Sequence, residues 1–249
     1  MRAHFGGSSR KSLVASRVSL DAAVKGADAN SASALSSELF FVADVLSTNI
    51  AVRRALTDPS RDGKVKAAFI SELFGKKVGA VALGLVTELS DLRWSAPKDL
   101  VLVLEQLAIE AEASAANIEG ELDRVEDEIF TAAAAFASST ELRKALTSDA
   151  TNAKATLVAD ILKGASGSTV KLVSQMVNAW RGRSIESAFA DYQAALAARR
   201  NRVIALVRVA APLSQAQQDR LATTLTSKVG QPVRINIEID PTVLGGVSV

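Results

Sequence analysis

The sequence predicts a mainly α protein, with duplicated helical bundles followed by a small α/β (β-α-β) C-terminal domain. Two observations support this fold class. Apolar residues make up 48% of the chain but aromatic residues only 4%, and the abundant alanine and leucine favour helices. Apolar residues also recur at three- and four-residue steps along most of the chain, and after residue 201 this pattern changes to the alternation typical of strands.

The first predicted domain, residues 1–117, contains six helical patterns. Their expected ranges are 12–25, 33–49, 50–57, 62–74, 77–93 and 97–117. Pro59 ends the third pattern, because proline cannot continue a helix and disfavours helical backbone in the residue before it. In the fourth pattern, Val65, Phe69 and Leu73 are spaced to face inward. Gly75 is then expected as a left-handed cap.

A second copy of this arrangement is predicted at residues 118–201. The segments ELF (38–40) and RRALT (53–57) align with EIF (128–130) and RKALT (143–147), 90 positions later. The order of the helices repeats as well. Chance supplies identities between alanine-rich helices more readily than it supplies the same order and spacing of elements. The sequence therefore indicates an internal duplication, with each copy forming a small bundle.

The third predicted domain, residues 202–249, is expected to be α/β. RVIALVRV (202–209) is rich in β-branched residues and PVRINIEID (232–240) alternates apolar with polar residues, so both predict strands. Ser214 and Gln217 predict a capping box at the start of the helix between them.

The chain after the second strand suggests a third strand that is cut short. Asp240-Pro241 is expected to turn the chain. Gly245-Gly246 is expected to let the backbone bend or bulge as the third strand begins. Because the sequence stops at Val249, we expect a truncated C-terminal domain.

Composition excludes several kinds of chemistry. With no cysteine and a single histidine, His4, thiolate chemistry and histidine-based catalysis or metal binding are not expected. KGASGST (163–169) lacks the ending of a phosphate loop and follows a helical pattern, so it predicts an interhelical turn with Ser168 as its cap. The acidic run ELDRVEDE (121–128) is expected to be the solvated start of a helix. No catalytic residues, metal ligands or cofactor are therefore predicted.

Membrane insertion is not predicted either. The longest apolar run, VGAVALGLV (78–86), has about half of the roughly 20 residues that a membrane-spanning helix needs. The first residues carry no apolar stretch of the kind that signal peptides contain. The protein is expected to work without spanning a membrane, though it could work beside one.

Several stretches of the sequence resemble one family. The predicted strand VRINIEI is followed by Asp240, an apolar residue and Gly245-Gly246. The segment ELFGKKVGAVALGLVTEL (72–89) resembles the join of the fourth and fifth helices in the N-terminal bundle of that family. The segment SSRKSLVASRVSLDAAV (8–24) resembles the first helix of the same bundle. Together these resemble the delta subunit of F-type ATP synthase, which is related to the mitochondrial oligomycin-sensitivity-conferring subunit. The likeness is to long actinobacterial forms that carry an extra bundle-like segment. Members of the family continue beyond the point at which this sequence stops.

The resemblance implies a non-catalytic stator subunit of the peripheral stalk, at the cytoplasmic face of the bacterial cell membrane. Its N-terminal bundle would bind the N-terminal helices of alpha subunits, and its C-terminal domain would bind subunit b. The head would then resist the torque of the rotor during proton-driven ATP synthesis. The alternative is an unrelated cytoplasmic helical adaptor that binds another amphipathic helix.

The candidate contacts for a partner helix lie on two helices of the first bundle. They are Val14, Arg17 and Val18 on the first helix, and Val81 and Leu85 on the fifth. An amphipathic helix can lay its apolar face into a groove between such helices. The competing interpretation is that these residues only hold their own bundle together. Two bundles also lead us to expect contact with more than one partner helix.

Overall fold

The computed structural model describes residues 5–147, 151–199, 203–210, 212–229, 233–239 and 247–248. Over these residues the protein is mainly α, as predicted, with three strands near its C-terminus. The chain divides into two compact units, Met1–Tyr192 and Gln193–Val249. The division lies within the last helix of the helical region, close to the predicted start of the C-terminal domain at residue 202.

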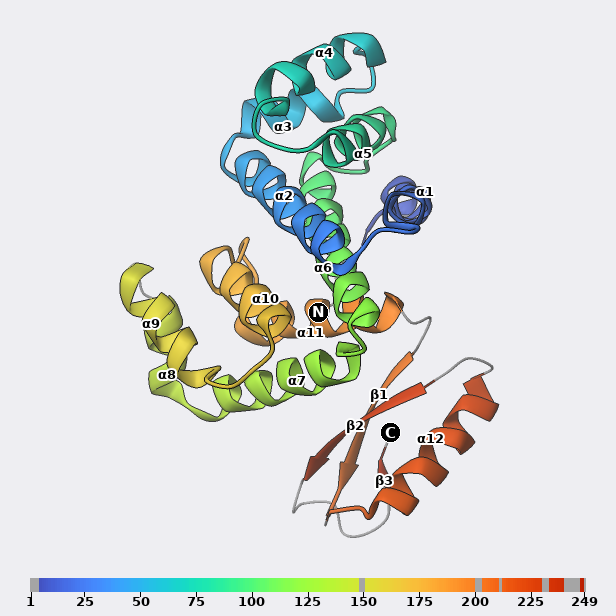
Figure 1. The fold of residues 1–249 in the computed structure, drawn as a ribbon, viewed down its shortest axis with the longest axis vertical. Coiled ribbons are helices and arrows are strands. Elements are labelled where there is room, and N and C mark those ends of the chain that lie inside the picture. Colours follow the sequence, from blue (N-terminus) through green and yellow to red (C-terminus); the bar gives the residue numbers. More distant parts are fainter. Residues whose placement is uncertain are drawn as a thin grey trace. The chain divides into compact units, whose positions relative to one another are not determined.

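The first six helices correspond one to one to the predicted patterns, although the first begins five residues and the second four residues earlier than predicted. They are α1 (Gly7–Val24), α2 (Ala29–Thr48), α3 (Ile50–Thr57), α4 (Gly63–Phe74), α5 (Ala80–Asp91) and α6 (Pro97–Ile118). Helix α2 packs along α6, while α1 contacts both α5 and α6 (Figure 1). The chain leaves α6 through Gly120, whose φ of +76° is a conformation that favours glycine.

Five more helices complete the helical region. They are α7 (Leu122–Ser138), α8 (Thr140–Thr147), α9 (Thr151–Ile161), α10 (Gly167–Asn178) and α11 (Ile185–Arg199). Helix α7 contacts α6 and α8, and α10 contacts α6, α7 and α9. In Figure 1, α7 to α10 form an arc that returns to the lower half of α6.

Helix α6 is the centre of the first unit. Nearly every residue from Asp99 to Ala116 is buried. A helix at the surface of a bundle buries only one face, whereas α6 contacts α1, α2, α3, α7 and α10 around its circumference. Four of its buried residues are carboxylic acids, namely Asp99, Glu105, Glu110 and Glu112. Buried carboxylates require hydrogen-bonded partners, and these partners come from other helices.

The inward face of α4 differs from the predicted one. The buried residues are Lys66, Ile70 and Phe74, whereas Val65 is 57% exposed. The helix is thus turned by one residue, about 100°. The reason is that the ammonium group of Lys66 donates a hydrogen bond to the carbonyl oxygen of Ser90, 2.8 Å away, which allows a lysine to occupy the interior.

Two predicted caps also differ. Gly75 has a φ of −59° and right-handed helical backbone, so it is not the left-handed cap that the sequence suggested. Its N–H instead continues the helical pattern by donating to the carbonyl of Ser71. The segment 163–169 does form an interhelical turn, but Ser166 rather than Ser168 caps α10, since its side chain accepts a hydrogen bond from the N–H of Thr169.

The second unit contains a small sheet. Strands β1 (Val203–Val209) and β2 (Val233–Ile239) pair in parallel, and α12 (Gln215–Val229) connects them and contacts β2. Strand β3 (Val247–Ser248) pairs antiparallel with β1, giving the order β2-β1-β3. The predicted capping box is confirmed, because the Ser214 N–H donates to the side-chain oxygen of Gln217 at 2.8 Å and the Gln217 N–H returns a bond to the Ser214 hydroxyl.

The C-terminal motif lies outside this description. Asp240, Pro241, Gly245 and Gly246 do not belong to the described residues. Their predicted turn and bend remain predictions.

Candidate functional site

Helix α1 buries serines in its first half and exposes two valines on its outer side. The side facing the rest of the unit carries Ser9, Ser12 and Ser16 before it reaches Leu20 and Val24. The apolar residues Val14 and Val18 point outward and are 62% and 65% exposed. Single apolar residues are common on protein surfaces, whereas apolar residues aligned on one face of a helix are less common there. The two exposed valines therefore make α1 a candidate contact surface.

Hydrogen bonds explain how a serine face can be buried. The Ser9 hydroxyl donates to a carboxylate oxygen of Asp99 at 2.7 Å, and the Ser12 hydroxyl donates to the carbonyl oxygen of Arg93 at 2.6 Å. The Ser16 hydroxyl donates to the carbonyl of Ser12 within the helix. Each buried hydroxyl is therefore satisfied. These contacts fix the rotation of α1 and so hold its valines at the surface.

The other candidate contacts take different positions. Val81, on α5, is 53% exposed. Arg17 lies between the two valines of α1 in sequence, and its guanidinium donates two hydrogen bonds to Glu110 of α6, at 2.7 and 2.8 Å. Leu85 is only 3% exposed and belongs to the core of the bundle. The structure thus leaves Val14, Val18 and Val81 accessible on two neighbouring helices, with Arg17 anchored beside them.

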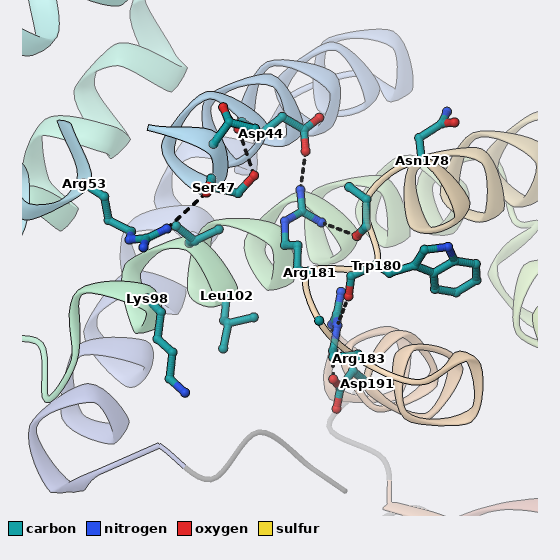
Figure 2. A pocket seen from close by; sticks show the side chains of 14 residues that line it. Asp44, Ser47, Arg53, Lys98, Leu102, Asn178, Trp180, Arg181, Arg183 and Asp191 are labelled. Atoms are coloured by element: carbon teal, nitrogen blue, oxygen red, sulfur yellow. Dashed lines mark hydrogen bonds and ion pairs between the residues drawn. The ribbon is translucent and has the colours of Figure 1, made fainter. Parts of the chain in front are cut away.

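A buried ion-pair network, which the sequence did not reveal, joins α6 to the α10–α11 turn. Glu105 accepts hydrogen bonds from Arg181 at 2.5 Å, from Arg183 at 2.7 Å and from the Tyr192 hydroxyl at 3.2 Å. Arg181 also pairs with Asp44 of α2. Figure 2 shows Arg181 reaching toward Asp44, with Arg183 beside Asp191. One carboxylate therefore organises two arginines and links segments that lie 76 or more residues apart in the chain.

The environment of this network shifts the pKa values of its members. Burial alone would lower the pKa of Arg183, but the charge of Glu105 more than offsets burial, so the pKa lies above its ordinary value. Burial and the same carboxylate both raise the pKa of Tyr192 well above its usual range. The tyrosine is therefore a permanent hydrogen-bond donor and the arginine permanently charged. Their role is structural rather than acid–base.

A cleft of about 740 Å³ lies beside the network. Its walls are formed by α2, α3, α6 and the α10–α11 turn, with Arg53, Lys98, Leu102 and Trp180 among the lining residues (Figure 2). Arg53 is held by the C-terminal end of α2, since it donates to the carbonyl oxygens of Leu46 and Ser47, both at 3.2 Å. The charged groups of this cleft are thus largely committed to one another and to backbone carbonyls.

A second polar cluster joins α10 to α2 and α6. The ammonium group of Lys171 donates to a Glu112 carboxylate oxygen at 2.7 Å and to the carbonyl oxygen of Ser33 at 2.5 Å. The Ser168 hydroxyl donates to the other oxygen of Glu112 at 2.7 Å. The network around Glu105 and the cluster around Glu112 together attach α10 to the first six helices.

The described residues contain no group of three side chains that could hold a metal ion. The acidic run at 121–128 coincides with the start of α7, as the sequence predicted, but it is not solvated throughout, because Glu126 is buried and Glu128 accepts hydrogen bonds from Ser166. Among the described helices, none is long and apolar enough to cross a membrane by itself, and α2 and α3 reach that length only as a pair bent by 107°.

These features define a class of protein: a helical scaffold whose buried polar groups serve to join its helices. Comparison with known proteins identifies the family. Residues 110–249 match the family model described as ATP synthase delta (OSCP) subunit. The chain is 42% identical over 246 residues to the ATP synthase subunit delta of Streptomyces coelicolor, covering 98% of this chain and 89% of that protein.

Other relatives give the same result. The chain is 40% identical to the ATP synthase subunit delta of Salinispora arenicola, covering 92% of this chain and 85% of that protein. It is 38% identical to the corresponding protein of Thermobifida fusca, covering 94% of this chain and 90% of that protein. The chain belongs to the ATP synthase delta (OSCP) subunit family. It is a non-catalytic, peripheral-stalk subunit of F-type ATP synthase.

Proposed function

We propose that this subunit ties the catalytic head to subunit b at the cytoplasmic face of the bacterial cell membrane. The first bundle binds the N-terminal helix of an alpha subunit, and the C-terminal β-α-β unit contacts subunit b. The head is thereby prevented from turning with the rotor during proton-driven ATP synthesis. Family membership supports this role and disfavours an unrelated helical adaptor.

The observation that carries the proposal is the outward apolar face of α1. Val14 and Val18 are one helical turn apart and more than 60% exposed, and the neighbouring α5 adds the exposed Val81. Helices α1 and α5 are in contact along the side of the bundle. An amphipathic helix placed between them can bury all three valines at once, which is the helix-in-groove mode of recognition.

Arg17 and Leu85 have supporting roles in this proposal. Arg17 is held against α6 by Glu110, so it fixes α1 in position and leaves a partly exposed guanidinium at the edge of the groove. Leu85 is buried, so it supports α5 from beneath and does not touch the partner directly. We therefore restrict the proposed contact surface to Val14, Val18 and Val81, with Arg17 at its edge.

We further propose that residues 1–117 and 118–201 are copies of one ancestral bundle, followed by the C-terminal domain at 202–249. The burial of side chains supports this. Each buried residue of α7 follows a buried residue of α2 by 90 positions, and each buried residue of α10 follows one of α5 by 87. The pairs on α2 and α7 are Ala32 and Leu122, Leu35 and Val125, Ser36 and Glu126, Leu39 and Ile129, Val42 and Ala132, and Leu46 and Phe136.

The match on α5 and α10 is equally regular. Its pairs are Ala82 and Thr169, Leu85 and Leu172, Val86 and Val173, Leu89 and Met176, and Ser90 and Val177. Corresponding helices of the two copies therefore bury corresponding faces, in the same order along the chain. This agreement is independent of residue identity, since Ser36 corresponds to Glu126.

Calorimetry with the full chain tests the groove. The ligand is a synthetic peptide of the alpha-subunit N-terminal helix. Val14→Asp with Val18→Asp should weaken binding by about 2–4 kcal/mol, because two valines lose their burial and charges enter an apolar contact. Val65→Asp is the matched control, since Val65 is 57% exposed on α4. Equal binding by both variants would contradict the groove.

A further inference from the structure

We infer that the second bundle has its own version of the α1–α5 groove, lying between α6 and α10, and that α2 of the same chain already fills it. The chain then offers one open groove of this kind, despite its two bundles. This inference rests on the proposed function of the α1–α5 groove and on the proposed duplication.

The first step is the match between α5 and α10. Because their buried residues correspond at a spacing of 87 positions, their outward residues correspond as well. On α5, Val81 and Gly84 face outward and are exposed. The corresponding positions on α10 are Ser168 and Lys171. Both of these make contacts with α6, and Lys171 also reaches α2.

The second step is that α6 lies against α10 as α1 lies against α5. In the first bundle, Ser12 of α1 bonds to the carbonyl of Arg93, just beyond the C-terminal end of α5. In the second, Glu105 of α6 accepts a bond from Arg181, just beyond the C-terminal end of α10. Each contact comes from the N-terminal half of α1 or α6. Helix α6 therefore serves both as the last helix of the first bundle and as the first helix of the second.

The third step concerns the position of α2. Ser33, near the start of α2, accepts hydrogen bonds from Lys171, near the start of α10. Asp44, eleven positions later on α2, pairs with Arg181, which follows the end of α10. Eleven residues of helix span about 16 Å, close to the length of α10. Helix α2 thus runs in the same direction as α10 and is tied to it near both of its ends.

The contacts of α2 with α6 show that these two helices run in opposite directions. Ser33 donates to Glu112, in the C-terminal half of α6, whereas Asp44 shares Arg181 with Glu105, seven residues earlier in that helix. Helix α2 is therefore antiparallel to α6, which it contacts extensively. It occupies, over the α6–α10 pair, the position that the proposed partner helix takes over α1 and α5.

This arrangement revises the expectation that two bundles bind more than one partner helix. The second groove is closed by covalent continuity and by two contacts with α2. Lys171 donates hydrogen bonds to Ser33, and Arg181 forms an ion pair with Asp44, so α2 is held near both ends of α10. In the first groove, Val81 and Gly84 stand at the positions that correspond to Ser168 and Lys171, and neither side chain carries a charge or a hydrogen-bond donor.

A cross-linking and calorimetry experiment on the full chain tests the inference. The chain contains no cysteine, so Ser37→Cys with Gln175→Cys introduces one unique pair. These positions lie one helical turn beyond Ser33 and Lys171 on two parallel helices, and a short bis-maleimide should join them. The probe is the synthetic alpha-subunit peptide. Both the unlinked and the linked chain should bind one peptide, with affinities that agree within about twofold.

Each other result has a distinct meaning. Two peptides bound by the unlinked chain and one by the linked chain would overturn the inference, because a partner helix could then displace α2. Failure of the pair to cross-link would also overturn it, since α2 would not run parallel to α10. No binding by either form would refute the proposed α1–α5 groove itself.

Discussion

Glu38 and Glu128 lie 90 positions apart and make equivalent contacts. A carboxylate oxygen of Glu38 accepts a hydrogen bond from the N–H of Gly79, the residue before α5, at 2.8 Å. An oxygen of Glu128 accepts one from the N–H of Ser166, the residue before α10, at 2.9 Å. In both cases a carboxylate from one helix satisfies a free N–H at the start of another and complements the positive end of its dipole.

The first prediction follows from these two caps. Glu38→Ala and Glu128→Ala should each lower the free energy of unfolding by about 1 kcal/mol, the usual cost of losing a helix cap. Chemical denaturation monitored by circular dichroism measures the effect. Glu72→Ala, at an exposed position of α4, is the control and should change stability by less than about 0.5 kcal/mol. An effect of the control as large as that of the caps would contradict the assignment.

The second prediction concerns pH. Burial on its own raises the pKa of Glu128, but hydrogen bonds from Thr169, Ser166 and Arg124 outweigh it and leave the pKa below its ordinary value. A carboxyl group with a lowered folded-state pKa stabilises the fold above its unfolded pKa of about 4.3, and this contribution disappears as the pH falls through the folded pKa. The stability difference between wild type and Glu128→Gln should therefore shrink between pH 7 and pH 3. A constant difference across that range would refute the role of the charge.

The third prediction concerns the buried network around Glu105. Replacing Glu105 with glutamine removes the charge that compensates Arg181 and Arg183, both of which are largely buried. Breaking a buried pair in this way costs about 3–5 kcal/mol. Urea denaturation should show a loss of that order. Glu121→Gln, which removes an exposed partner of Arg124, should cost less than about 1 kcal/mol. Similar losses in the two variants would argue against a structural role for the network.

The fourth prediction concerns the direction of the docked helix. If the partner lies over α1 and α5 as α2 lies over α6 and α10, it runs parallel to α5. A nitroxide at the N-terminus of the alpha-subunit peptide should then broaden the amide resonances near Val81, and one at its C-terminus those near Asp91. The opposite pattern would show that the two grooves hold helices with different polarity.

The sequence predicted the helices well because their ends carry strong local signals. Asp58-Pro59 ends α3, and Ser214 with Gln217 begins α12. The rotation of each helix was harder to predict. When alanine, serine and single valines occur on every side of a helix, the apolar pattern does not distinguish its buried face from its exposed face. For this reason α4 was expected to bury Val65, whereas it buries Lys66.

The buried charges could not be predicted from the pattern at all. A glutamate in a helix usually marks a solvated face, and the partners of Glu105 lie 76 or more residues away. One signal was nevertheless present: Glu105 and Glu112 are seven residues apart, on one face of a helix that is otherwise largely apolar. Two acidic residues on the same side of such a helix indicate that it has polar partners on that side.

The central claim is that the chain physically links the catalytic head to subunit b. It is tested by mixing the purified head, the chain and the extramembrane part of subunit b, and by measuring the mass of the complexes with light scattering after size-exclusion chromatography. We predict that the wild-type chain forms a ternary complex with the head and subunit b. The variant with Val14→Asp and Val18→Asp should still bind subunit b but should no longer bind the head. A wild-type chain that binds only one of the two partners, or neither, would contradict the account.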